Sequence, residues 1–133
     1  MKHALIAVLV SFLPAAVQAQ ATPPRTIVKP LMTRELPDIA GKEATVTALE
    51  YPPGSSSPPH RHNAHVFLHL LEGQLQVQVR GGPLVTLNPG DTFYESPSDI
   101  HEVSRIASAT VPARARVFMV KEKGAPATTL VKD

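Results

Sequence analysis

Hydrophobic and polar residues alternate most regularly between positions 74 and 79. Glutamines at 74, 76 and 78 alternate there with Leu75, Val77 and Val79. A period of two is typical of a β-strand with one buried and one solvated face, because successive side chains point to opposite sides. The Gly81-Gly82 pair that follows predicts a hairpin turn.

Other short apolar segments are bounded by turn-forming residues in the same way. They predict strands over residues 44–51, 60–71, 84–87, 92–95, 101–105 and 115–121. We find no convincing amphipathic helix, and 14 prolines and 7 glycines disfavour helices. The pattern therefore predicts an all-β chain folded as a sandwich or a barrel.

The first residues have the layout of a secretory signal peptide. A short basic start with Lys2 precedes an apolar run of residues 4–13, which Pro14 ends. The run is shorter than the roughly 20 residues that span a bilayer. We expect cleavage after Ala19, with Ala21 as the alternative, and a periplasmic or secreted protein.

The remaining chain divides by composition. Residues 20–40 are rich in proline and predict an extended arm, residues 41–123 contain the strands of the barrel, and residues 124–133 form a tail. The arm either has no fixed position or adds a strand to a partner subunit. Because of this arm we expect a homodimer, in which pairing would also protect unpaired strand edges.

Composition excludes several kinds of site. The chain has no cysteine, so a metal ion has only imidazole or oxygen ligands available. Removal of the signal takes away one of 13 basic residues and leaves 12 facing 11 acidic ones. A nearly neutral chain gives no electrostatic reason to expect nucleic acid or, after cleavage, a membrane as a partner.

The histidines are unevenly distributed. Four of the six lie within ten positions, at His60, His62, His65 and His69, and His101 follows on a later strand. Residues i and i+2 of a strand share a face, so His60 and His62 can converge on one ion. His65 can join them if the strand bends there, and His101 can approach from the opposite side in an antiparallel barrel.

The spacing around these histidines resembles the two motifs of the cupin superfamily. Gly54 is followed after five residues by His60-Arg61-His62, and Gly73 closes the first motif. In the second motif Gly90 and His101 are eleven apart, with Pro97 between them. The resemblance covers about residues 44–121.

Two positions depart from the family pattern. Val66 stands where the first motif carries a glutamate, and His65 is one place earlier. Arg105 stands at the closing asparagine of the second motif. These departures affect the expected ligand set more than the expected fold.

The resemblance implies a double-stranded β-helix, or jelly-roll barrel, with one divalent transition metal ion in its mouth. It implies His60, His62 and His101 as ligands, with His65 as a further candidate in place of the glutamate. Imidazole ligation suits Fe, Ni, Cu or Zn, and Mn is also compatible. His69 has the opposite parity to His60 and is expected to face away from the ion.

Tyr94 and Glu95 are candidates for a catalytic acid or base, because they precede the turn before His101. The alternative is that they only end a strand at the rim. The cupin resemblance implies a dioxygenase-type or isomerase-type enzyme acting on a small organic molecule. A non-catalytic cupin that binds a small ligand or a metal is the alternative, since a fold alone does not fix function.

Overall fold

The computed structural model describes residues 21–132, which form eleven β-strands and no helix. The strands are β1 (Ile27–Glu35), β2 (Lys42–Tyr51), β3 (Ser56–Ser57), β4 (His60–Arg61), β5 (Ala64–Glu72), β6 (Leu75–Val79), β7 (Val85–Leu87), β8 (Thr92–Glu95), β9 (His101–Ile106), β10 (Ala113–Glu122) and β11 (Thr129–Leu130). Within residues 21–132 no helix is long and apolar enough to cross a bilayer.

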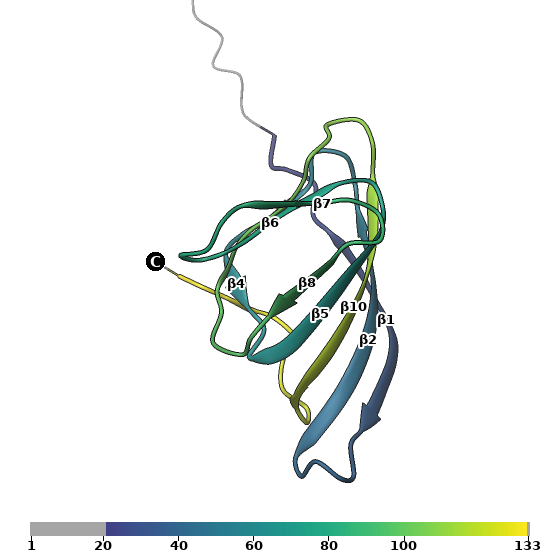
Figure 1. Cartoon of the computed structure of the whole chain (residues 1–133), viewed down its shortest axis with the longest axis vertical. Coiled ribbons are helices and arrows are strands. Elements are labelled where there is room, and N and C mark those ends of the chain that lie inside the picture. The colour runs from purple at the N-terminus through teal and green to yellow at the C-terminus, as the bar shows by residue number, and fades with distance from the viewer. Residues whose placement is uncertain (1–20, 133) are drawn as a thin grey trace, which may run out of the picture.

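Two antiparallel sheets face each other (Figure 1). One sheet has the order β1-β2-β10-β5-β8. The other has the order β11-β4-β9-β6-β7, with β3 also paired to β9. Within the described residues the chain passes from one sheet to the other seven times, after β2, β4, β5, β7, β8, β9 and β10. The all-β jelly-roll prediction is confirmed.

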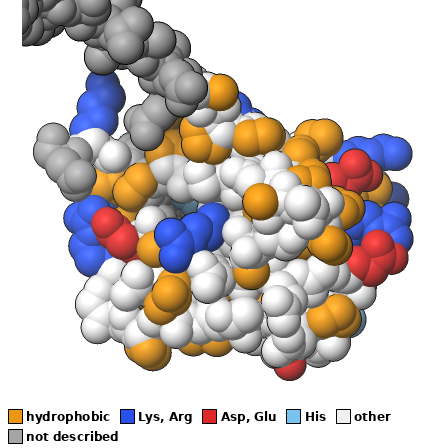
Figure 2. Space-filling view, turned by 90° about the horizontal axis from the view of Figure 1, so that it is seen from above, with side chains coloured by type: hydrophobic (Ala, Val, Ile, Leu, Met, Phe, Trp, Pro, Cys, Tyr) orange, Lys and Arg blue, Asp and Glu red, His pale blue; other side chains and the backbone are white. Residues whose placement is uncertain are grey.

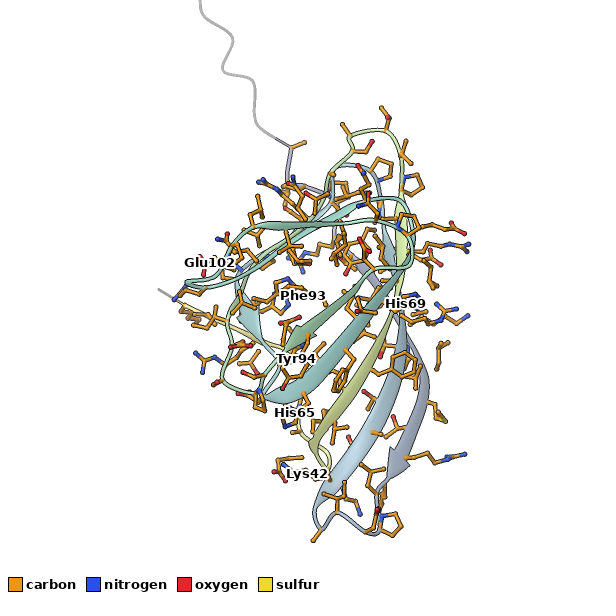
Figure 3. The ribbon with its side chains drawn as sticks, viewed as in Figure 1. Lys42, His65, His69, Phe93, Tyr94 and Glu102 are labelled. Atoms are coloured by element: carbon orange, nitrogen blue, oxygen red, sulfur yellow. The ribbon has the colours of Figure 1, made fainter. Side chains whose placement is uncertain are left out.

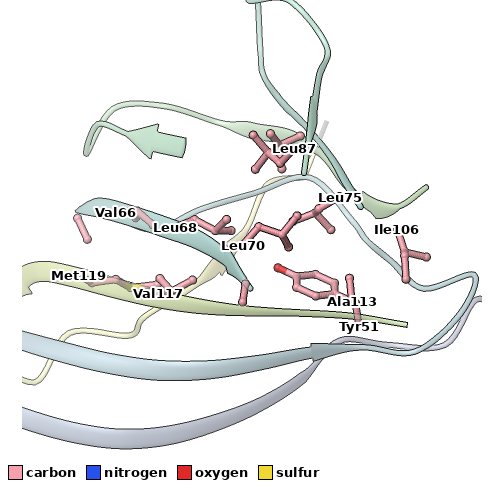
Figure 4. Close-up of a cluster of buried hydrophobic side chains, with 13 residues drawn as sticks. Tyr51, Val66, Leu68, Leu70, Leu75, Leu87, Ile106, Ala113, Val117 and Met119 are labelled. Carbon is pink, nitrogen blue, oxygen red and sulfur yellow. The ribbon is translucent and has the colours of Figure 1, made fainter. Parts of the chain in front are cut away.

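The core lies between the two sheets and follows the alternation seen in the sequence. On β5 and β10 every second side chain is buried, and the intervening ones are more exposed. Leu70 of β5 and Leu75 of β6 lie in this core (Figure 4), and these two side chains and Val77 of β6 are fully buried. Burying one such side chain contributes about 1.5–3 kcal/mol, so the period-two pattern is what holds the sheets together.

Two segments differ from their sequence-based description. Residues 27–35 of the expected arm form β1, which pairs with β2 of the same chain. The expected tail contains β11, which pairs with β4. Backbone hydrogen bonding thus fixes both segments to the barrel. The expected signal peptide, residues 1–19, lies outside the described residues.

The segment 60–71 is not one strand. It divides at Asn63, whose φ of 49° is in the left-handed region. β4 before it belongs to the six-stranded sheet and β5 after it belongs to the five-stranded sheet. Asparagine adopts this conformation more readily than most residues, so the corner falls where the sequence tolerates it.

The surface of the barrel has charges of both signs. On the face shown in Figure 2, basic and acidic side chains lie intermixed rather than in a block of one sign. Three partly exposed cross-strand or inter-segment ion pairs join Lys42 to Glu122, Arg80 to Glu102, and Arg114 to Glu72. Such pairs contribute little individually, so the core carries most of the stability.

Gly73, in the turn between β5 and β6, is expected to be intolerant of a side chain. Its φ is 75°, and an added Cβ would lie 2.4 Å from the Pro112 carbonyl oxygen. We expect Gly73→Ala to lower the free energy of unfolding by about 2–4 kcal/mol, from backbone strain plus overlap. Urea unfolding monitored by circular dichroism measures this loss.

Gly81 provides the matched control for this prediction. Its φ is 84°, but nothing lies within 4 Å of an added Cβ. Gly81→Ala is therefore expected to show only the backbone strain, about 1–2 kcal/mol. Equal losses for the two variants would contradict the packing argument at Gly73.

Candidate metal centre

Three histidines meet at one end of the space between the sheets. His60 begins β4, His62 follows that strand directly, and His101 begins β9. One ligand nitrogen from each ring lies within 4.8 Å of the other two. The ring of His60 has its centroid 4.9 Å from that of His62 and 5.0 Å from that of His101. This convergence is the geometry that a shared metal ion needs.

Strand pairing explains why residues far apart in sequence meet here. His60 and His101 are direct partners in the antiparallel β4–β9 pair. Directly opposite residues point to the same side of a sheet, so both rings enter the barrel. His62 lies two positions after His60 and keeps the same parity. His60 and His101 are buried, and His62 is partly exposed.

Each ring is held through its Nδ1 atom. His60 Nδ1 lies 2.8 Å from the Pro58 carbonyl oxygen, and His62 Nδ1 lies 2.7 Å from that of Ala127. A carbonyl only accepts hydrogen bonds, so Nδ1 carries the proton in both rings and Nε2 keeps its lone pair. Metal-binding histidines usually have an Nδ1 partner of this kind.

His101 completes the set. Its Nδ1 lies 3.1 Å from Glu95 Oε1, and its Nε2 is buried with no hydrogen-bond partner among the described residues. A buried nitrogen without a partner is costly unless another group satisfies it. With Nδ1 engaged, each ring leaves Nε2 available, and the clustering of one ligand nitrogen per ring within 4.8 Å fits a divalent transition metal ion, which binds imidazole nitrogen at about 2.0–2.1 Å in the case of zinc.

The surroundings of His60 favour its neutral ring. Burial lowers the pKa of His60, and the neighbouring rings of His101 and His62 lower it further, against the hydrogen bond to the Pro58 carbonyl. The imidazole is therefore neutral at neutral pH and able to bind a cation.

Glu95, named in the sequence as a catalytic candidate, lies in this site. Only 2% of it is exposed, and its Oε2 lies 3.9 Å from His62 Nε2. Burial raises the pKa of Glu95, but the hydrogen bond from His101 and the attraction of the neighbouring histidines in their protonated forms outweigh burial and lower it. Glu95 is therefore an ionised carboxylate beside the three rings.

His65 does not join the other three histidines, and the expectation that it replaces the missing glutamate as a ligand is corrected. Its exposed side chain lies on the outer face of β5, and its Nδ1 is 2.8 Å from the Tyr94 hydroxyl (Figure 3). The corner at Asn63 does not change the alternation: even-numbered side chains face inward both before it and after it. His65 therefore has the same outward parity as His69, which faces away from the cluster as expected.

Tyr94, the second catalytic candidate, also lies outside the site. It is exposed, and its ring is stacked on that of His65 at a centroid distance of 6.1 Å. Tyr94 and Glu95 are adjacent on β8, so the alternation of a strand directs one outward and the other inward. The structure thus separates two residues that the sequence grouped together.

A cavity of about 340 Å³ adjoins the three histidines. Its walls are mainly apolar and include Val66, Leu68, Val117 and Met119, while Tyr51 and Ser104 add hydroxyl groups. Tyr51 hydrogen-bonds with Ser104, and burial raises its pKa, so the phenol is neutral. An apolar pocket with a few polar groups is typical of small-molecule sites.

Sequence reasoning missed several parts of this site. Ala127 and Thr128 of the expected tail both contact His62 Nδ1, at 2.7 and 3.3 Å, and Tyr51 and Ser104 line the cavity. Alternation along residues 44–48 would have misled for Tyr51, because the apolar Ala44, Val46 and Ala48 have the opposite parity. No sequence signal marks Ala127, because its backbone carbonyl makes the contact.

Comparison with known proteins identifies the family. The cupin domain model matches residues 48–120, more than half of the chain. No curated protein matches the sequence. Solved structures also match, but each of those described next is less than 25% identical to this chain and therefore shows the fold alone.

Three solved structures illustrate this similarity. A cupin-like protein from Thermotoga maritima is 20% identical, with a TM-score of 0.64 and coverage of 81% of this chain and 77% of that one. Oxalate oxidase in complex with the substrate analogue glycolate is 22% identical, with a TM-score of 0.60 and coverage of 83% and 57%. A DMSP lyase from Ruegeria pomeroyi is 24% identical, with a TM-score of 0.58 and coverage of 66% and 43%.

This chain therefore spans less than half the length of that lyase. The family match nevertheless covers His60, His62 and His101, together with most of the residues that line the adjoining cavity. On these grounds the protein belongs to the cupin superfamily.

Proposed function

We propose that this protein binds one divalent transition metal ion through His60, His62 and His101 and acts as a metal-dependent enzyme on a small organic molecule. The supporting observation is that the three rings, each held through Nδ1, bring one ligand nitrogen apiece within 4.8 Å of the other two and line a mainly apolar cavity. A bound ion of this kind supplies Lewis acidity and, for Fe, Cu, Ni or Mn, redox chemistry. Dioxygenase-type and isomerase-type reactions are the two classes proposed.

The number of ligands supports catalysis over a structural role for the metal. Structural zinc sites are closed by four protein ligands, whereas catalytic sites keep a position for water or substrate. His65 faces outward, so among the described residues the cluster offers three imidazoles. The adjoining cavity leaves room for a substrate beside them.

The residues around the cavity have separate roles in this proposal. Tyr51 and Ser104 offer hydroxyl groups that orient a polar substituent of the substrate, and the apolar walls exclude water from the rest. Arg25 lines the cavity with an exposed guanidinium and suits an anionic group on the substrate. Oxalate oxidase and DMSP lyase, two proteins of this fold, act on small molecules.

The experiment combines metal reconstitution with an activity panel. Untagged protein is stripped with a chelator and reloaded separately with Fe²⁺, Ni²⁺, Cu²⁺, Zn²⁺ and Mn²⁺. Oxygen consumption is then measured against small organic acids, thiols and phenols, and aldose–ketose conversion against sugars. Turnover that needs the metal and is lost in His60→Ala supports the proposal.

A non-catalytic metal or ligand-binding cupin is the second candidate. It is favoured by Val66, which removes a carboxylate from the position where the family motif carries one. A protein that binds one ion and a small ligand, with no turnover across the panel, would support this candidate over the enzyme.

Export to the periplasm or the medium is part of the proposal and rests on the sequence of residues 1–19 alone. Mass spectrometry of the protein from its natural host tests it. We expect a chain that begins at Gln20, or at Thr22 if cleavage follows Ala21. A cytosolic chain that retains the apolar run of residues 4–13 would contradict export.

We also propose that a second copy of this chain covers the outer face of the five-stranded sheet. A row of direct cross-strand partners on that face consists of Met32, Val46, Phe118, Phe67 and Tyr94. The three aromatic members are each 46–48% exposed. A two-fold axis through the row would place the same apolar side chains against each other, as a self-complementary interface requires.

Phe67→Lys is expected to convert the homodimer to a monomer in sedimentation velocity, because it places a charge between the two other aromatic side chains of the row, Phe118 and Tyr94. Leu84→Lys is the control, since Leu84 is also 46% exposed but lies before β7 in the other sheet. A monomeric unmodified protein at micromolar concentration, or a Phe67→Lys dimer, would contradict the proposed interface.

A further inference from the structure

The first motif lacks its carboxylate, and the neighbouring strand supplies one. Val66 occupies the motif position and is 1% exposed on the inner face of β5. In the β5–β8 pair its direct partner is Glu95. Directly opposite residues project from the same face, so the Glu95 carboxylate enters the cavity beside the position that the motif leaves apolar.

The contacts of Glu95 define what it does there. Its Oε1 lies 3.1 Å from Nδ1 of His101, not from the unpartnered Nε2 of that ring. A carboxylate that accepts the Nδ1 proton fixes the tautomer and the ring orientation, and it makes Nε2 a stronger donor. Pro58 and Ala127 do the same for the other two histidines through neutral carbonyls.

The charge of Glu95 gives it a second effect. It is the only carboxylate among the described residues that line the cavity, and its ion-pair partners in residues 21–132 are His62 and His101. A buried carboxylate without a Lys or Arg partner is costly. A divalent ion bound by three neutral imidazoles has the opposite need, because its charge is not offset by any ligand.

We propose that Glu95 is the positioning residue of this metal centre: it replaces the missing motif glutamate from the adjacent strand, orients His101 through Nδ1 and offsets the charge of the ion. This inference rests on the proposed metal site. In this proposal Glu95 acts through its Oε1 contact with His101 Nδ1, the nitrogen that is not the proposed ligand atom, and orients the ring rather than binding the ion.

Titration of untagged, metal-free protein with Co²⁺ and Zn²⁺ tests this role. Glu95→Gln removes the charge and keeps an acceptor for the His101 proton, whereas Glu95→Leu removes both. We expect one ion per chain in each case, with affinity about 10- to 100-fold weaker in Glu95→Gln and weaker still in Glu95→Leu. Glu102→Gln is the matched control, because Glu102 follows His101 on β9 and pairs with Arg80 at 2.6 Å.

A spectroscopic measurement separates positioning from general loss of structure. In the zinc-loaded protein, long-range ¹H–¹⁵N spectra report the tautomer of each histidine. We expect the His101 Nδ1 proton signal to shift in Glu95→Gln, while the signals of His60 and the thermal unfolding midpoint of the metal-free protein stay close to those of the unmodified chain.

The possible outcomes are distinct. Unchanged affinity and an unchanged His101 signal in Glu95→Gln would overturn the role of Glu95 while leaving the metal site intact. Loss of an oxygen ligand from the Co²⁺ absorption spectrum of Glu95→Gln would show direct ligation and would also overturn it. An unmodified protein that binds neither ion would contradict the proposed function and this inference together.

Discussion

His101→Ala is expected to abolish stoichiometric metal binding, whereas His65→Ala leaves it intact. His101 contributes one of the three clustered nitrogens, and its loss leaves two ligands on one side of the ion. The loss should exceed the roughly 10- to 100-fold typical of residues that only orient a ligand. His65 lies outside the cluster and bonds to Tyr94, so its removal changes an exposed contact.

The comparison of these two variants is informative because both residues belong to the histidine-rich pattern. Metal content by inductively coupled plasma mass spectrometry, on untagged protein stripped and reloaded with Zn²⁺, measures the difference. His69→Ala serves as a second outer-face control. Equal loss in His65→Ala and His101→Ala would contradict the ligand set derived from the structure.

Removal of residues 126–133 is expected to weaken metal binding by about 10-fold or more while leaving the barrel folded. His62 Nδ1 would lose the Ala127 carbonyl at 2.7 Å and the Thr128 hydroxyl at 3.3 Å, so its ring would no longer be fixed. The pairing of β11 with β4, the strand that begins with His60, would also be lost. The core residues all precede this segment.

The truncation point is chosen to keep a buried polar contact. Lys121 Nζ donates to the Ala125 carbonyl oxygen at 2.6 Å and also pairs with Glu43, so the chain should end after Ala125. Removal of residues 132 and 133 alone is the control. Zn²⁺ titration measures the affinity and circular dichroism the fold. Unchanged affinity in a folded, truncated protein would show that the tail does not position His62.

Periodicity in the sequence was sufficient to predict most of the barrel. Residues 74–79 alternate because each strand has one face in the core, and this physical requirement can be read locally. The spacing of Gly54, His60, His62, Gly90 and His101 resembles the family motifs closely enough to predict a shared metal site. The structure brings the three histidines of those motifs together.

The same local reasoning, applied consistently, would have excluded His65. The parity that directs His69 outward applies equally to His65, four positions earlier. The bend anticipated near His65 does exist at Asn63, but it moves the chain between sheets without changing which side chains face inward. The error came from expecting a corner to reverse the alternation.

The sequence by itself determined the β-strands, the turns and the histidines that converge, because these depend on period and spacing along the chain. Only the tertiary structure decided that Glu95 lies opposite Val66, that Ala127 holds His62 and that residues 27–35 pair with their own sheet. Each of these depends on the register between segments distant in sequence. The register between two strands is set by how the whole set of strands packs, so it cannot be predicted from a local sequence pattern.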